Sequence, residues 1–327
     1  MINKILLILF ITFISCVREI TNFLPLGNEF EEIWKNVGEI SGDVFYVANS
    51  KLNEEVFYIS STSKIYKFKN DLFPILDISY CGQISSSFHY PEKIMFNEIS
   101  RDSFIFIFNV DENKLKEIKL PFSPSFFSFS PFDSLTFYFI ENKILIKSYN
   151  LIEFDTIYFF PSRCKNFILT KSGKIFVVTD HEIFYSDNQG ISFYPIFSSQ
   201  MSIIFATVDE EENVYVIFRD KVFKSKDFIL WEEVPLSFDG RYVRSITCIK
   251  RGFICAYFID EELKTYKFTQ DKFIEFSYGL FYRTDTREII LSGNGSNILM
   301  AISYGDGEWD YAEGTLFFYF KDTELPP

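Results

Sequence analysis

The sequence has only two histidines in 327 residues, His89 and His181, and they lie far apart with no cysteine or histidine beside them. Zinc and most transition metals in proteins are held by clustered histidine, cysteine and carboxylate side chains. The five cysteines match no zinc-ligand spacing either. The sequence therefore predicts no metal centre, and nothing in it indicates a cofactor.

Positive charge is also scarce. Lys and Arg number 32 against 45 Asp and Glu, which gives a formal net charge of −13. No basic segment relieves this excess of negative charge. The phosphate backbone of a nucleic acid repels such a surface, so nucleic-acid binding is not expected.

Long apolar runs are absent too, apart from one stretch of ten residues at 5–14, ILLILFITFI. Ten residues are too few to cross about 30 Å of hydrocarbon as a helix. The stretch follows Lys4 and is typical of the core of an export signal. The four residues at its end, Phe13-Ile14-Ser15-Cys16, resemble a bacterial lipobox with Phe in place of the usual Leu.

This resemblance implies a lipoprotein-type signal peptide over residues 1–15 and lipidation of Cys16, the first residue of the mature protein. Residues 16–28 would then be a tether. The protein would be exported and anchored by its lipid to a bacterial membrane, with the rest of the chain outside the cytoplasm. Ordinary signal cleavage that leaves Cys16 unmodified is the alternative.

Four cysteines remain: Cys81, Cys164, Cys248 and Cys255. An even number in an exported protein permits disulfides, and Cys248 and Cys255 flank a predicted turn at 250–252. Four cysteines in so long a chain are no disulfide framework, however, so we expect buried thiols and leave the pairing open.

No long segment has the periodicity of a helix. Apolar or alternating runs of five to eight residues are separated by Gly, Asn, Asp, Ser or Pro, which is typical of short antiparallel strands. Aromatic residues make up 20% of the chain and suit pleated, half-buried surfaces. The sequence predicts an all-β protein.

One type of strand, with polar residues on one side and aromatic residues on the other, recurs along the chain. Its copies begin at Lys64, Lys114, Lys143, Glu182, Lys221, Leu263 and Thr315. The mean spacing of about 42 residues is that of β-propeller blades. Residues 29–327 are therefore predicted to form one propeller of seven four-stranded antiparallel blades, although six or eight also fit the length. An N-terminal strand around Glu32-Ile33-Trp34 is expected to close the ring.

One turn carries a motif that can be named. Its residues are Ser186, Asn188, Gly190, Ser192 and Phe193, and a weaker copy contains Ser225, Asp227 and Trp231. The pattern resembles the Asp-box of BNR-repeat propellers. Short polar side chains can bond the backbone of the turn, and glycine permits a positive φ. The resemblance implies a structural role between the two outer strands of a blade, without chemistry.

Ligands of propellers usually bind on the face formed by the turns between second and third strands and by the links between blades. Arginines gather there among aromatic residues and carboxylates, and an arginine fork suits a carboxylate or phosphate. The candidate binding residues are Arg241, Arg244, Tyr282, Arg283, Asp285, Arg287, Asp306, Glu308, Trp309 and Asp310. Ordinary solvated loops are the alternative. The acidic run 209–213 on the opposite face is expected to be a solvated turn.

These features favour a lipid-anchored, non-catalytic binding or interaction module, with a glycan, a peptide or an envelope protein as the partner. No catalytic residue is assigned. The alternative is a glycoside hydrolase resembling sialidases, which need an arginine triad, a Tyr–Glu pair and an Asp acid. The Arg-Ile-Pro-type motif near the start of that family's first blade is absent, as is a full set of Asp-boxes. The oligomeric state stays open.

Overall fold

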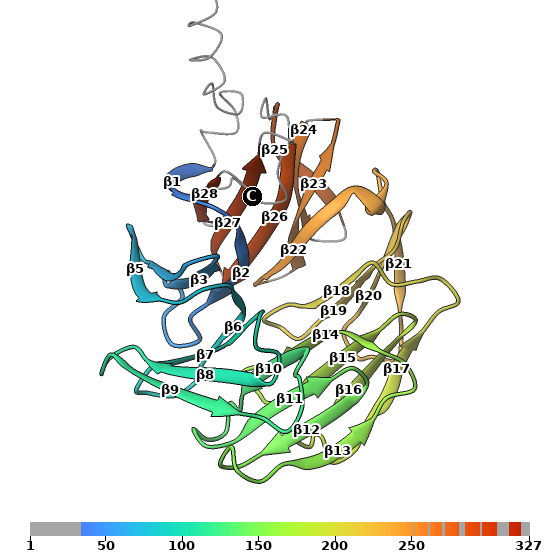
Figure 1. Ribbon diagram of the computed structural model, residues 1–327. Helices are drawn as coiled ribbons and strands as arrows, with labels where there is room; N and C mark the ends of the chain where they lie inside the picture. Colours follow the sequence, from blue (N-terminus) through green and yellow to red (C-terminus); the bar gives the residue numbers. More distant parts are fainter. Residues whose placement is uncertain are drawn as a thin grey trace, which may run out of the picture.

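The computed structural model describes residues 34–250, 252–260, 262–269, 272–280, 285–294, 296–305 and 314–321. Its strands form seven four-stranded antiparallel sheets, arranged as the blades of a β-propeller (Figure 1). The predicted fold class and blade number are confirmed. The seven innermost strands are neighbours around the ring and surround a central channel.

Six blades are built from consecutive strands, which run in order from the innermost to the outermost. Blade 1 contains β2 (Val44–Asn49), β3 (Phe57–Ser61), β4 (Lys64–Phe68) and β5 (Leu72–Asp77), and blade 2 contains β6 (Cys81–Ser86), β7 (Lys93–Glu98), β8 (Phe104–Asn109) and β9 (Lys114–Lys119). Blade 3 contains β10 (Phe126–Phe129), β11 (Phe137–Glu141), β12 (Ile144–Ser148) and β13 (Asp155–Phe159), and blade 4 contains β14 (Cys164–Leu169), β15 (Ile175–Thr179), β16 (Glu182–Ser186) and β17 (Tyr194–Ser198). Blade 5 contains β18 (Phe205–Val208), β19 (Val214–Ile217), β20 (Lys221–Ser225) and β21 (Glu232–Pro235), and blade 6 contains β22 (Val243–Ile249), β23 (Gly252–Ile259), β24 (Glu262–Thr269) and β25 (Lys272–Leu280). Blades 5 and 6 are joined through the short 3-10 helix η1 (Gly240–Tyr242).

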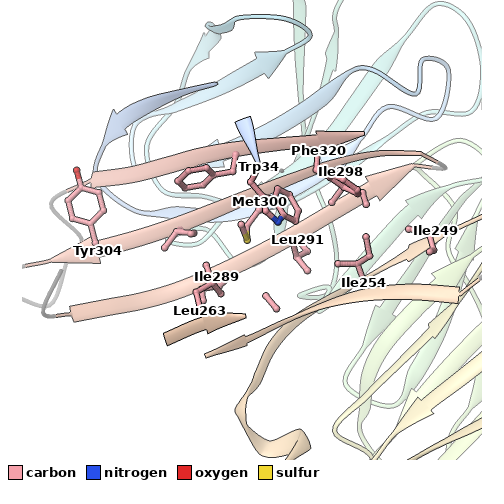
Figure 2. Packing of buried hydrophobic residues seen from close by; sticks show 13 residues of the cluster. Trp34, Ile249, Ile254, Leu263, Ile289, Leu291, Ile298, Met300, Tyr304 and Phe320 are labelled. Atoms are coloured by element: carbon pink, nitrogen blue, oxygen red, sulfur yellow. The ribbon is translucent and has the colours of Figure 1, made fainter. Parts of the chain in front are cut away.

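Blade 7 combines the two ends of the chain. It contains β26 (Asp285–Asn294), β27 (Asn297–Gly305), β28 (Gly314–Lys321) and, outermost, β1 (Lys35–Ser41). The sequence placed the closing strand around residues 32–34, but β1 begins one residue later, and Glu32 and Ile33 lie outside the described residues. Trp34 precedes the strand and is fully buried, with its ring 5.3 Å from the Phe320 ring and Met300 in the same cluster (Figure 2).

One predicted repeat proves wrong. The segment that begins at Lys114 is β9, the outermost strand of blade 2, and the third strand of that blade is β8. All residues of β9 except Ile118 are exposed. Lys alternates with aliphatic residues in outer strands as it does in third strands. The sequence therefore predicted a third strand at Lys114 where the structure has an outer one. Third strands begin at residues 64, 104, 144, 182, 221, 262 and 314, at regular intervals except for the last.

Burial explains the character of the strands. The second strands of blades 1 and 4, FYISS and IFVVT, are buried at every position because neighbouring blades cover both faces. The apolar clusters accordingly lie between adjacent blades, and phenylalanine is the most frequent buried residue in two of them. No helix among the described residues is long and apolar enough to cross a membrane.

The blades define two faces of the ring. We letter the strands of each blade A to D, counted outward. The AB–CD face carries the turns between strands A and B and between C and D. The BC–DA face carries the BC turns and the links between blades. Because β1 is a D strand, the chain reaches its first residue, Lys35, on the AB–CD face.

Candidate functional site

A cavity of about 580 Å³ occupies the AB–CD half of the central channel. It is lined by residues of all seven innermost strands and of the AB turns. Its wall includes the aromatic residues Tyr46, Phe88, Phe127 and Phe167, the hydroxyl-bearing residues Ser86, Thr170, Thr207 and Thr247, and the charged residues Lys51, Lys171 and Glu210. This volume falls within the range of small-ligand sites.

Lys51 is a half-buried positive charge in the cavity wall. Its ammonium lies 5.7 Å from the centroid of the Phe88 ring. Burial lowers the pKa of Lys51, and the nearby positive charge of Lys171 lowers it further. Within the described part of the chain, no carboxylate comes within ion-pair distance of this ammonium. An anionic ligand in the channel would compensate for both effects.

Contacts between blades fix the position of Lys51. Its backbone N–H donates to Ser86 Oγ at 3.0 Å, and that hydroxyl donates to the carbonyl of Asn49 at 2.9 Å. Lys171 lies across the channel in blade 4, with its ammonium 4.0 Å from a carboxylate oxygen of Glu54. Two AB turns from non-adjacent blades thus place two cations on one cavity.

The acidic run 209–213 also contributes to this cavity, but the expectation of a solvated turn is wrong for its ends. Asp209 and Asn213 are buried. The Asp209 carboxylate accepts hydrogen bonds from Asn213 N (2.8 Å), Asn213 Nδ2 (2.8 Å), Tyr215 OH (2.9 Å) and Gly252 N (3.0 Å). Glu212 accepts hydrogen bonds from Ser172 and Lys174. Among the described carboxylates on the cavity wall, only Glu210 is exposed and makes no ion pair or side-chain hydrogen bond.

On the BC–DA face, the candidate Arg241 is committed to a local partner. Its guanidinium donates to Asp239 through Nη2 at 2.7 Å and through Nε at 3.1 Å, and Arg219 Nε reaches the same carboxylate at 3.2 Å. The hydrogen bonds from Arg241 hold the pKa of Asp239 at about 2, well below its usual range. Arg244 is exposed on β22, and neither Arg241 nor Arg244 lines the cavity.

The remaining candidates on that face stay predictions. Asp285 and Arg287 lie in β26. Tyr282, Arg283, Asp306, Glu308, Trp309 and Asp310 lie outside the described residues, as does Cys16.

The turn at 186–193 has the internal bonding expected from its residue types. Ser186 Oγ accepts a hydrogen bond from Gly190 N at 3.0 Å, and Asn188 Oδ1 accepts one from Ser192 N at 3.0 Å. Gly190 has a φ of +86°, and Phe193 is buried. In blade 5, Asp227 Oδ1 accepts from the backbone N–H groups of Ile229 and Leu230, both at 2.9 Å.

Sequence reasoning missed a third turn of this kind, in blade 3. Ser148 Oγ accepts from Leu151 N, and Asn150 Oδ1 accepts from Ile152 N and Glu153 N, all at 2.9 Å. Leu151 has a φ of +62°, which matches +64° at Phe228 of blade 5. The signal that could have revealed it is the spacing Ser-x-Asn/Asp followed four residues later by an aromatic residue, which Phe154 and Trp231 share.

Cys81, Cys164, Cys248 and Cys255 are free thiols. Cys248 lies opposite Phe253 and Cys255 opposite Ile246, so the two are not cross-strand partners. Cys248 lines the cavity. In the described part of the chain, no group of three His, Cys, Asp or Glu residues is arranged to hold a metal ion.

Comparison with known proteins shows the fold alone. No family model matches the sequence, and no curated protein is found as a relative. Among solved structures, the chain is similar to virginiamycin B lyase from Staphylococcus aureus, with a TM-score of 0.62, 10% identity and coverage of 86% of this chain and 98% of that one. It is also similar to the β-propeller domain of Cps50 (Swd1) from Myceliophteria thermophila, with a TM-score of 0.63, 10% identity and coverage of 87% and 99%. Hsv2 from Kluyveromyces lactis has a TM-score of 0.58, 10% identity and coverage of 86% and 100%.

Proposed function

We propose that the protein is an exported, lipid-anchored β-propeller that binds a ligand or partner without catalysis. The observation that carries the binding role is the channel cavity, where Lys51 has no carboxylate beside it among the described residues. The ligand that suits this wall has an acidic group for Lys51 and a ring or apolar part for Phe88 and Phe127. An acidic glycan or an acidic peptide end fits that description.

Catalysis as in sialidases is not favoured. It would require arginines that converge without local partners on one substrate carboxylate, whereas Arg219 and Arg241 share Asp239. We further propose that the turns at 186–193, 225–231 and 148–154 are Asp-box-type turns. Their side-chain bonds to the backbone and their positive φ values support this assignment, which gives them a structural role.

Binding in the channel is tested with arrays of acidic glycans and peptides. Thr207 is half-buried on the cavity wall, so Thr207→Trp should fill the channel and abolish binding. Thr156 lies exposed on the outer strand β13, and Thr156→Trp is the matched control. Ligands retained by Thr207→Trp would show that the channel is not the site. Hydrolysis of a fluorogenic sialoside by the wild-type protein would refute the non-catalytic role.

The anchor has a separate test. Mass spectrometry of the membrane fraction should find Cys16 acylated as the first residue of the mature protein, and Cys16→Ala should stop acylation. Soluble, unacylated protein from cells that carry the wild-type sequence would overturn the proposed anchor, whatever the binding experiments show.

A further inference from the structure

Large aliphatic side chains protrude from the same turn in three successive blades. The CD turn of blade 3 exposes Ile152 (80%), that of blade 4 exposes Ile191 (80%), and that of blade 5 exposes Ile229 (79%) and Leu230 (72%). Single exposed aliphatic residues are ordinary on protein surfaces. Here they repeat at one structural position on three adjacent blades, and we call these three turns the CD edge of blades 3–5.

The turns hold these side chains outward. The backbone N–H groups of Ile152, Ile229 and Leu230 are bonded to the Asn150 or Asp227 side chain, which fixes the tip of each turn. The aromatic residue that follows packs inward instead, as Phe193 does in blade 4. Phe193 is buried and Trp231 of blade 5 is half-buried, while the aliphatic tips are exposed.

Tyrosines accompany the aliphatic tips. Tyr149 is 54% exposed three positions before Ile152, and Tyr194 is 56% exposed three positions after Ile191. Aliphatic residues at a protruding tip with tyrosine next to them suit a membrane interface, where the tip enters the acyl region and the tyrosine remains at the headgroups. A protein partner would have to offer a separate pocket to each tip, whereas a lipid surface accepts all of them.

The position of the edge agrees with a membrane as the occupant. The CD turns lie on the face where the chain reaches Lys35. Residues 16–33 can span at most about 65 Å when fully extended, so a lipid on Cys16 would keep the propeller within that distance of a bilayer. Figure 1 shows the outer strands β13, β17 and β21 along the outside of the ring, so contact through their turns would lie at the rim of the AB–CD face.

We infer that the CD edge of blades 3–5 inserts into the interface of a lipid bilayer and orients the tethered propeller on it. The inference rests on the proposed anchor, but it concerns different residues. The three turns carry one Lys against three carboxylates, Glu153, Asp187 and Asp227. Binding therefore depends on apolar contact, with zwitterionic lipid preferred over anionic lipid.

The test uses the mature chain, residues 16–327, with Cys16→Ser so that no acyl chain contributes. Its partitioning onto phosphatidylcholine vesicles is measured by flotation. The edge variant combines Ile152→Ser, Ile191→Ser, Ile229→Ser and Leu230→Ser. The control variant combines Ile99→Ser, Leu115→Ser, Met201→Ser and Ile274→Ser, which are also exposed aliphatic positions, at 45–47%.

We expect the edge variant to lose at least tenfold in partition coefficient and the control variant to remain within twofold of the parent. In a second measurement, Ile191→Trp should shift its fluorescence to shorter wavelength on vesicle addition, and Ile99→Trp should not. No partitioning of the Cys16→Ser chain, or equal partitioning of the edge and control variants, would overturn the inference. Failure of Cys16 acylation is detected separately by mass spectrometry and leaves these vesicle measurements valid.

Discussion

The indole nitrogen of Trp34 donates a hydrogen bond of 3.3 Å to Oγ1 of Thr265, a residue 231 positions further along the chain. Thr265 lies in the third strand of blade 6, while Trp34 immediately precedes the outermost strand of blade 7. The N-terminal strand therefore does more than complete its own sheet, because the residue before it also contacts the neighbouring blade. Trp34 thus joins blade 7 to blade 6 at the point where the ring closes.

Trp34→Ala should lower the free energy of unfolding by about 3–5 kcal/mol, because it removes a fully buried ring from the cluster of Met300 and Phe320 and leaves a cavity. Urea titration followed by circular dichroism measures the change. Trp34→Phe keeps part of the ring and should cost less. Unchanged stability of Trp34→Ala would show that the junction does not hold the ring closed.

Gly190→Val should destabilise the protein by about 1–3 kcal/mol, because a β-branched residue resists the φ of +86° at this position. A Cβ atom there would also lie 2.6 Å from Cδ1 of Ile157. Gly190→Asn introduces the same Cβ but tolerates a positive φ, so it should cost less. Thermal unfolding of both variants separates backbone strain from crowding, and equal losses would argue against backbone strain.

Asp209→Ala should cost about 2–4 kcal/mol, because the donors of Asn213 and Gly252 would be left without their acceptor in the protein interior. Glu210→Ala, at the exposed neighbouring position, is the matched control and should change stability by less than about 0.5 kcal/mol. Similar losses in both variants would mean that the buried carboxylate is not what links blade 5 to blade 6.

The architecture could be predicted from the sequence, because polar and apolar residues alternate within the blade strands and the strands recur at a regular spacing. The period of about 40 residues and the absence of helical patterning determine an all-β propeller. Local spacing alone does not distinguish a third strand from an outer one, as β9 shows, because both alternate on the same two-residue period.

The channel cavity could not be predicted in the same way. Lys51, Lys171 and Cys248 come from blades 1, 4 and 6, and only ring closure brings them onto one wall. Of the arginines that the sequence singled out, Arg241 binds a carboxylate only two residues away in the chain. The buried role of Asp209 also depends on Gly252, from another blade, which no local pattern reveals.

Thiol reactivity provides an independent test of the cavity. Cys248 is half-exposed on the cavity wall, whereas Cys81, Cys164 and Cys255 are buried. Burial raises the pKa of Cys164 and Cys255 to about 12 and raises that of Cys81 as well. Burial also raises the pKa of Cys248, but the Lys51 ammonium opposes that shift. In the folded mature chain with Cys16→Ser, Ellman's reagent should therefore modify one thiol per molecule.

The rate of this modification should rise with pH, since the thiolate is the nucleophile and the folded pKa lies above the ordinary value. Lys51→Met should slow the reaction, because it removes the charge that favours the thiolate. Lys69→Met is the control: Lys69 is exposed outside the cavity and should leave the rate unchanged. All four thiols should react in denaturant. Equal rates for Lys51→Met and Lys69→Met would show that Lys51 does not act on Cys248 within a shared cavity, which would weaken the ligand site proposed around Lys51. Reaction of two or more thiols in the folded protein would contradict the burial of Cys81, Cys164 and Cys255.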